Sequence, residues 1–171
     1  MIIIIITIIL GFFITTLFGH VVHYALHQPW SGKVHKAHLT HHLIKYPPHD
    51  FMSDEYRSAG KDSTPKFFVW AGLPLIITPI ILWLCGIIPL VIMITILSVE
   101  GIIGFLHSYL HDAFHIKNHW LYKVPILGKQ FSKLVHLHYL HHVGKMNFNF
   151  GIFTFLWDRV CGTFTKSRNK I

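Results

Sequence analysis

Histidine is unusually abundant in this chain, with 16 of the 171 residues, and its imidazole ring can bind metal ions. Most of these histidines lie in four short clusters, spaced three or four residues apart. Residues at these spacings share one face of a helix, so each cluster would direct two or three imidazoles toward one place. Imidazole is the commonest metal ligand, and nitrogen ligands with few carboxylates favour iron, zinc or copper over calcium or magnesium. The pattern therefore predicts a protein that binds two metal ions.

The predicted ligands are too many for one ion but match two ions with open coordination positions. They are His23 and His27; His38, His41 and His42; His107, His111 and His115; and His138, His141 and His142. In the third cluster the register stays open, so two or all three histidines would bind. His20 lies closer to an apolar run and is a weaker candidate. His35 would either join the second cluster or support it from outside.

Two carboxylates lie close to the third cluster. Glu100 precedes His107 by seven residues, on nearly the same helix face, and Asp112 follows His111. A carboxylate near the end of a membrane helix is costly unless it has a partner. We hypothesise that each accepts a hydrogen bond from the free ring nitrogen of a ligand histidine and so orients that ring. No residue beyond the metal ligands is predicted to be catalytic.

The composition is that of a membrane protein. Hydrophobic residues make up 52% of the chain, charged residues only 13%, and the mean hydropathy is +0.48. The net charge of +8 is not arranged as a basic stripe with interleaved aromatic residues, which argues against nucleic acid as a partner. The two cysteines, Cys85 and Cys161, form neither a C-x-x-C pair nor a disulfide framework.

Two long apolar segments predict helices that cross a membrane. Residues 2–22 can span the roughly 30 Å hydrocarbon core, and they lack the basic start of a cleavable signal peptide. Residues 67–106 suffice for two spans, and Gly86 and Pro89 would break the helix between them. We therefore predict a retained span at about 2–22 and a transmembrane hairpin with spans at about 67–85 and 88–106.

The basic residues predict which side of the membrane the histidines face. All 15 Lys and Arg residues lie either between Lys33 and Lys66 or from Lys117 onward. One span followed by a hairpin puts both regions on the same side, and the positive-inside rule makes that side cytoplasmic. We therefore expect cytoplasmic metal-binding regions at about 23–66 and 107–165, with all four clusters at one membrane face.

The expected fold is one all-α integral membrane domain over residues 1–171. It would consist of an N-terminal transmembrane helix, a transmembrane helical hairpin, and a cytoplasmic helical cap that carries a histidine-rich dinuclear metal site. Residues 148–157 are apolar but too short to cross the bilayer. They would pack under the metal site or lie in the membrane interface.

These features resemble the fatty acid hydroxylase / sterol desaturase superfamily of membrane-bound, histidine-box di-iron oxygenases. The likeness covers about residues 20–165, with four histidine clusters in order, an Asn/Phe/Gly stretch and a Trp-Asp-Arg ending. The last two are Asn147-Phe148-Asn149-Phe150-Gly151 and Leu156-Trp157-Asp158-Arg159-Val160-Cys161-Gly162-Thr163-Phe164. The arrangement His111-Asp112-x-x-His115 is also similar to carotenoid hydroxylases of this superfamily.

The resemblance implies a membrane-bound oxidoreductase, a monooxygenase with two iron ions that takes part in lipid metabolism. It would use molecular oxygen and two electrons to hydroxylate a fatty acyl chain, a sterol or a carotenoid. The electrons would come from a separate donor such as a b-type cytochrome or a ferredoxin. The membrane would be the endoplasmic reticulum or a bacterial inner membrane. Trp157 and Asp158 would be structural and pin the C-terminal segment.

Several alternatives stay open from the sequence. A lipid desaturase would use the same site, since both reactions begin with hydrogen abstraction. Zinc can occupy such ligands in the isolated protein, and a non-enzymatic zinc-binding membrane protein would use the same histidines. A transporter should place its polar ligands near the bilayer midplane, whereas these clusters lie at the ends of the spans. A bis-histidine haem protein would leave most of the clusters unused.

Overall fold

The computed structural model describes residues 1–57, 64–143 and 146–167, with the backbone alone for 64–69. Parts of the predicted metal-binding regions, residues 58–63 and 144–145, lie outside the described residues. The α-helices are α1 (Ile2–Leu26), α2 (Lys33–Thr40), α3 (Thr64–Leu84), α4 (Leu90–Ala113), α5 (Leu127–Val143) and α6 (Leu156–Val160). Short helical turns at Pro29–Ser31, Pro48–Asp50 and Trp120–Lys123, and a π-helical turn at His41–Lys45, complete the elements. The described residues contain no strand, so the predicted all-helical fold is confirmed.

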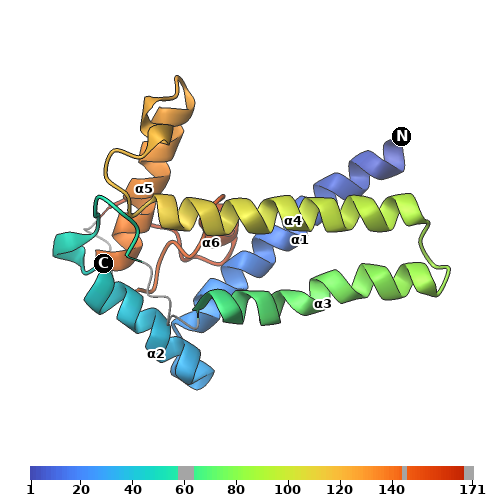
Figure 1. The fold of residues 1–171 in the computed structure, drawn as a ribbon, viewed down its shortest axis with the longest axis horizontal. Helices are drawn as coiled ribbons and strands as arrows, with labels where there is room; N and C mark the ends of the chain where they lie inside the picture. The colour runs from blue at the N-terminus through green and yellow to red at the C-terminus, as the bar shows by residue number, and fades with distance from the viewer. Residues whose placement is uncertain (58–63, 144–145, 168–171) are drawn as a thin grey trace.

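Helices α1, α3 and α4 form a long arm (Figure 1). Helix α4 packs against both other helices, and the N-terminus lies at the same end of the arm as the α3–α4 turn. Small residues let α1 approach α4 closely. A Cβ atom added at Gly11 would lie 3.1 Å from Val99 Cγ1, and one added at Gly19 would lie 2.9 Å from His107 Cε1.

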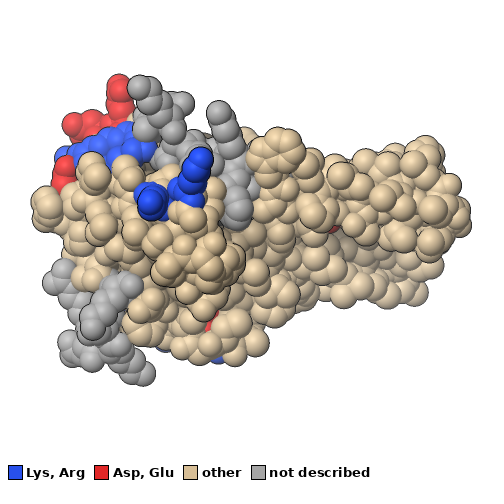
Figure 2. Space-filling view, turned by 90° about the horizontal axis from the view of Figure 1, so that it is seen from below, with Lys and Arg blue, Asp and Glu red and all other residues tan. Residues whose placement is uncertain are grey.

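The arm is apolar along its length. Helices α1 and α4 are long and apolar enough to cross a membrane, and α3 contributes a shorter apolar stretch, Trp70–Leu84. Many of their large hydrophobic side chains are exposed. In the view of Figure 2, the described Lys and Arg side chains lie at the end of the molecule opposite the tip of the arm. The side chain of Lys66, in the first turn of α3, is not among those described. This distribution is compatible with the predicted spans, whose boundaries in a bilayer stay predictions.

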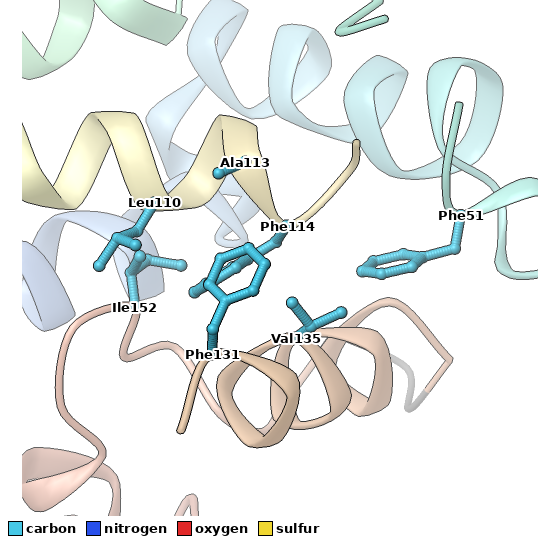
Figure 3. Packing of buried hydrophobic residues seen from close by; sticks show 7 residues of the cluster. All are labelled: Phe51, Leu110, Ala113, Phe114, Phe131, Val135 and Ile152. Atoms are coloured by element: carbon cyan, nitrogen blue, oxygen red, sulfur yellow. The ribbon is translucent and has the colours of Figure 1, made fainter. Parts of the chain in front are cut away.

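Helices α2, α5 and α6 with their loops form the head of the molecule, and α5 stands across the end of α4 (Figure 1). A buried apolar cluster joins the end of α4, the helix α5 and two loops. Figure 3 shows its members, Phe51, Leu110, Ala113, Phe114, Phe131, Val135 and Ile152. Its rings also touch the histidines, because the ring centroids of Phe51 and His115 are 4.7 Å apart and those of Phe114 and His138 are 5.4 Å apart. The cluster is thus a wall of the histidine site.

The third histidine cluster differs from a single helical stripe. Helix α4 continues beyond the apolar run to Ala113 and carries His107 and His111 in its last turns. It ends before His115, whose backbone N–H donates to the Asp112 carbonyl in the turn that follows. Ser53 pairs with Ile116 in an isolated bridge and holds this turn against the loop after the second cluster. Because the helix ends here, His115 points to a different place than an i+8 position would.

Candidate metal centre

Nine histidines gather in the head as two adjoining groups. Group A consists of His23, His27, His38, His42 and His141, and group B of His41, His115, His138 and His142. In each group the nitrogen atoms that could bind a metal all lie within 4.8 Å of one another. The nine residues are no more than 9% exposed. The structure therefore brings together residues that are up to 119 positions apart in the chain, as His23 and His142 are.

The two consecutive-histidine pairs explain why the groups adjoin. His41 and His42 follow α2 in the π-helical turn, a geometry common at functional sites, and His41 faces group B while His42 faces group A. In α5, His141 faces group A and His142 faces group B. Successive residues of a helix are about 100° apart, so each pair serves two neighbouring sites. The ring centroids of His42 and His142 are only 3.9 Å apart where the groups meet.

Backbone carbonyls fix the orientation of four of the rings. The Nδ1 atoms donate from His23 to Phe150 O (2.6 Å), from His141 to Phe148 O (2.6 Å), from His115 to Phe51 O (2.9 Å) and from His142 to Tyr46 O (2.9 Å). A carbonyl only accepts hydrogen bonds, so in each neutral ring the proton sits on Nδ1. The lone pair is then on Nε2, the atom that faces the centre of the group. These are the outer contacts that orient histidine ligands in metal sites.

The Nε2 atoms meet at spacings that suit a metal ion. In group A, His27 Nε2 is 3.0 Å from both His141 Nε2 and His38 Nε2, and His38 Nε2 is 3.1 Å from His42 Nε2. Nitrogen ligands bound at about 2.1 Å to one ion lie about 3.0 to 3.4 Å apart. The Nε2 atoms of His23, His41 and His142 are buried without a hydrogen-bond partner among the described residues. A metal ion would satisfy these atoms, so both groups fit a metal.

Burial keeps the imidazoles in their neutral form. Desolvation, followed by repulsion from neighbouring histidines, holds the pKa values of His38, His42 and His138 well below the usual value. Desolvation likewise lowers the pKa of His141 to about 4. A neutral ring has a free lone pair for a metal, whereas a protonated ring does not. The two groups are therefore ready to bind a cation at neutral pH.

Two of the predicted ligands lie outside these groups. His107 packs against Gly19 at the contact between α1 and α4. His111 borders group B, with its ring centroid 4.8 Å from that of His41, and its Nδ1 is 3.3 Å from Asp112 Oδ1. The second contact agrees with the orienting role proposed for Asp112. Whether His107 and His111 bind metal stays a prediction.

The other candidates of the sequence have different surroundings. His20 Nδ1 lies 3.6 Å from Asp158 Oδ2, and His35 Nδ1 donates to Leu26 O at 2.9 Å. Neither belongs to group A or B. The Oε2 atom of Glu100 is buried with no hydrogen-bond partner among the described residues, so this atom orients no described histidine.

Sequence reasoning missed Tyr46, and it named Asn149 and Asp158 only as parts of motifs with a structural role. Tyr46 is fully buried, stacks on His115 with centroids 3.9 Å apart, and supplies a carbonyl to His142. Asn149 and Asp158 are fully buried. The Asn149 side chain donates to Leu137 O, and the Asp158 carboxylate accepts from the backbone N–H of Phe150. The only signal for them in the sequence is the Asn/Phe/Gly and Trp-Asp-Arg motif, which indicates a structural role without a partner.

The described residues thus form a helical protein with an apolar arm and a centre of buried histidines. The family model for fatty acid hydroxylase matches residues 8–163, and the chain belongs to this family. Its members are membrane-bound oxidoreductases that hydroxylate or desaturate lipids. The match confirms the resemblance drawn from the histidine clusters. No curated protein and no solved structure matches the chain.

Proposed function

We propose that the protein is a membrane-bound, oxygen-dependent lipid hydroxylase with an iron ion in each histidine group. One observation carries the proposal: nine buried, neutral imidazoles form two adjoining groups whose Nε2 atoms converge. Iron bound there would supply the activation of oxygen needed to attack an unactivated C–H bond. All ligands in the two groups are neutral nitrogens. Such a set suits iron, and zinc can replace iron in the isolated protein.

The chain itself orients the histidine rings and excludes water from the site. The carbonyl contacts at Nδ1 hold the rings in place before metal binds, and this reduces the reorganisation that binding requires. The wall of Phe51, Phe114 and the rest of the apolar cluster keeps water away from group B. An enclosed, apolar site also protects reactive oxygen chemistry from side reactions.

The arm supports a proposal for the membrane. In this proposal α1, α3 and α4 span the bilayer and the head lies on the cytoplasmic side of the endoplasmic reticulum or a bacterial inner membrane. The support is the apolar surface of the arm together with the placement of all 15 Lys and Arg residues in regions 33–66 and 117–171. A lipid such as a fatty acyl chain, a sterol or a carotenoid would then reach the centre from the bilayer. A separate electron donor, a b-type cytochrome or a ferredoxin, would deliver electrons to the centre from the cytoplasm.

Expression in a host followed by lipid mass spectrometry tests the activity. We expect a new lipid heavier by one oxygen atom, which disappears in the His141→Ala variant. The control is His136→Ala, because His136 lies on the same helix but is exposed and belongs to neither group. A product lighter by two hydrogen atoms would identify a desaturase on the same site. A fully loaded chain with zinc alone and no altered lipid would favour the non-enzymatic alternative and contradict the proposal.

A further inference from the structure

The two histidine groups take their orienting carbonyls from two different chain segments. For group A, Phe148 O and Phe150 O accept from His141 and His23. For group B, Tyr46 O and Phe51 O accept from His142 and His115. A charged side chain next to one of these segments would therefore affect metal binding in one group more than in the other.

A buried carboxylate lies directly behind the segment that serves group A. Asp158 is 0% exposed. Its Oδ1 accepts from the backbone N–H of Phe150 at 2.7 Å and from the Thr163 hydroxyl at 2.9 Å. Its Oδ2 accepts from the backbone N–H of Gly151 at 2.8 Å. The carboxylate thus holds two successive amides.

The same peptide group connects this carboxylate to a metal ligand. The N–H of Gly151 and the carbonyl of Phe150 belong to one peptide unit. Its N–H side donates to Asp158 at 2.8 Å, and its carbonyl side accepts from His23 Nδ1 at 2.6 Å. An amide that donates to a carboxylate becomes a stronger acceptor at its carbonyl, because hydrogen bonds in series polarise one another. His23 then becomes a more electron-rich ligand, as when a histidine donates to a carboxylate directly.

The segment is built to allow this contact. A Cβ atom at Gly151 would lie 2.8 Å from Asp158 Oδ2 and 2.2 Å from Thr154 O, so only glycine brings its amide so close. Asn149 adopts a left-handed conformation with φ of 56°. Its side-chain amide donates to the carbonyls of Leu137 and Thr165 at 3.1 and 3.0 Å. These contacts place the carbonyls of Phe148 and Phe150 on the side of group A.

Group B has the opposite charge behind its segment. The Arg57 guanidinium lies 5.5 Å from the centre of the Tyr46 ring, and that ring stacks on His115. The guanidinium also donates to Lys45 O at 2.6 Å and pairs with Asp50 at 2.6 Å. Arg57 is 36% exposed, so solvent and Asp50 screen it, whereas the carboxylate of Asp158 is buried. Asp112 lies beside His111 at the border of group B, but its side chain is 44% exposed. A fully buried anion therefore supports group A, whereas solvent screens the charges near group B.

We propose that Asp158 is a positioning residue that acts through the Phe150–Gly151 peptide on His23 and makes group A the tighter metal site. The inference rests on the metal centre of the proposed function and on neither its lipid substrate nor oxygen. The two ions would thus be inequivalent, although both sites consist of imidazoles.

Titration of the full chain in detergent micelles with Co²⁺ alone tests the inference. The absorption of bound Co²⁺ and a competing chelator give both affinities without any lipid. We expect two classes of site in the unaltered chain, and a 10- to 100-fold loss at the tighter one in Asp158→Asn with the weaker one unchanged. General unfolding would weaken both sites. Thr163→Val retains the Oδ2 contact to Gly151 and should keep the tight site, and Asp54→Asn removes the same charge from an exposed position.

The possible outcomes distinguish the role of Asp158 from the existence of the metal centre. If the tighter site has the same Co²⁺ affinity in Asp158→Asn and in the unaltered chain, only the role proposed for Asp158 is overturned. A chain that binds no Co²⁺ would overturn the metal centre of the proposed function and this inference with it. If Asp158→Asn does not fold, the zinc-loaded unaltered chain still gives a test by NMR. The Nδ1 proton of His23 should resonate downfield of those of His115 and His142, and the reverse order would contradict the proposal.

Discussion

At the scale of single residues, the centre depends on which ring nitrogen carries the proton. Carbonyl acceptors at the Nδ1 atoms of His23, His115, His141 and His142 leave their Nε2 atoms free for metal. The ligands are thus prepared by backbone atoms, which any residue type can supply. Replacing a ligand should therefore be far more damaging than replacing the side chain that carries the accepting carbonyl.

Loss of one ligand should empty one site and leave the other. In His38→Ala we expect the metal affinity of group A to fall by more than about 100-fold, because loss of a ligand exceeds loss of an outer contact. Metal analysis of the purified chain should then give about one ion where the unaltered chain holds two. His136→Ala, in an exposed position, should retain both. Full metal content in His38→Ala would exclude His38 as a ligand.

The buried neutral histidines also predict that the metal-free protein loses stability in acid. Below about pH 6.5 the unfolded chain takes up protons that the folded chain does not, so the free energy of unfolding falls as the pH falls. His141, with a pKa of about 4 in the fold, loses its contribution between about pH 6.5 and pH 4. The urea midpoint of the metal-free protein should be constant above about pH 7 and decrease below it. A midpoint that rises in acid would contradict the neutral, buried state.

At the scale of elements, the contact between α1 and α4 determines where the first two ligands lie. His23 and His27 follow Gly19 by one and two helical turns. The His107 ring approaches Gly19 so closely that an added Cβ would lie 2.9 Å from Cε1, so the ring would have to move to admit a side chain. Helix α5 packs on the end of α4 through the buried apolar cluster, so a change in the spacing of α1 and α4 would move the α1 histidines relative to those of α5.

Substitution of Gly19 should separate the helices and weaken metal binding. We expect Gly19→Leu to reduce the free energy of unfolding by about 1–3 kcal/mol, the usual effect of overpacking, and to lower the metal content. The matched control is Gly104→Leu in α4, where an added Cβ meets no atom within 4 Å. Leucine favours helix over glycine, so this control should be neutral or stabilising by up to about 1 kcal/mol. Denaturation in micelles and metal analysis measure both, and equal effects would contradict the contact.

At the scale of the whole molecule, the surfaces of the head and the arm suit different surroundings. The head buries the polar imidazoles of groups A and B, which could hold metal ions, and the arm exposes apolar side chains along three helices. Metal should thus stabilise the head, and the bilayer should surround the arm.

Removal of metal should destabilise the protein as a whole. A ligand that binds only the folded chain adds about 2.7 kcal/mol when its free concentration is 100 times its Kd. A chelator should therefore lower the Tm, and Fe²⁺ or Zn²⁺ should restore it. The effect should exceed that of the same chelator on His141→Ala. An unchanged Tm in the unaltered chain would mean that the groups bind no metal as isolated.

The two free cysteines offer a test of the membrane arrangement. Cys85 is exposed at the far end of the arm, just after α3, and Cys161 is exposed in the head after α6. If the arm spans the bilayer, a membrane-impermeant thiol reagent should label Cys161 from the cytoplasmic side and Cys85 from the opposite side. The variants Cys85→Ser and Cys161→Ser assign each signal. Labelling of both from one side would contradict the predicted topology.

The sequence by itself determined the class of protein and most of the histidines that gather in the candidate metal centre. Imidazoles three and four residues apart must share a helix face, and a run of apolar residues as long as α1 suits a bilayer, so both follow from local spacing. The all-helical fold and the family membership agree with that reasoning. Of the eleven predicted ligands, nine lie in groups A and B.

Only the tertiary structure decided how those histidines divide between two groups and what lies behind them. The end of α4 before His115 and the opposite directions of His41 and His42 depend on how the helices pack in three dimensions. The carbonyls of Phe148 and Phe150 have no signature in the sequence, because every residue has a carbonyl group. Asp158 contacts this segment at a turn in which Asn149 is left-handed and Gly151 has no Cβ to block the carboxylate. Long-range contacts of this kind follow from the complete fold, since no local spacing encodes them.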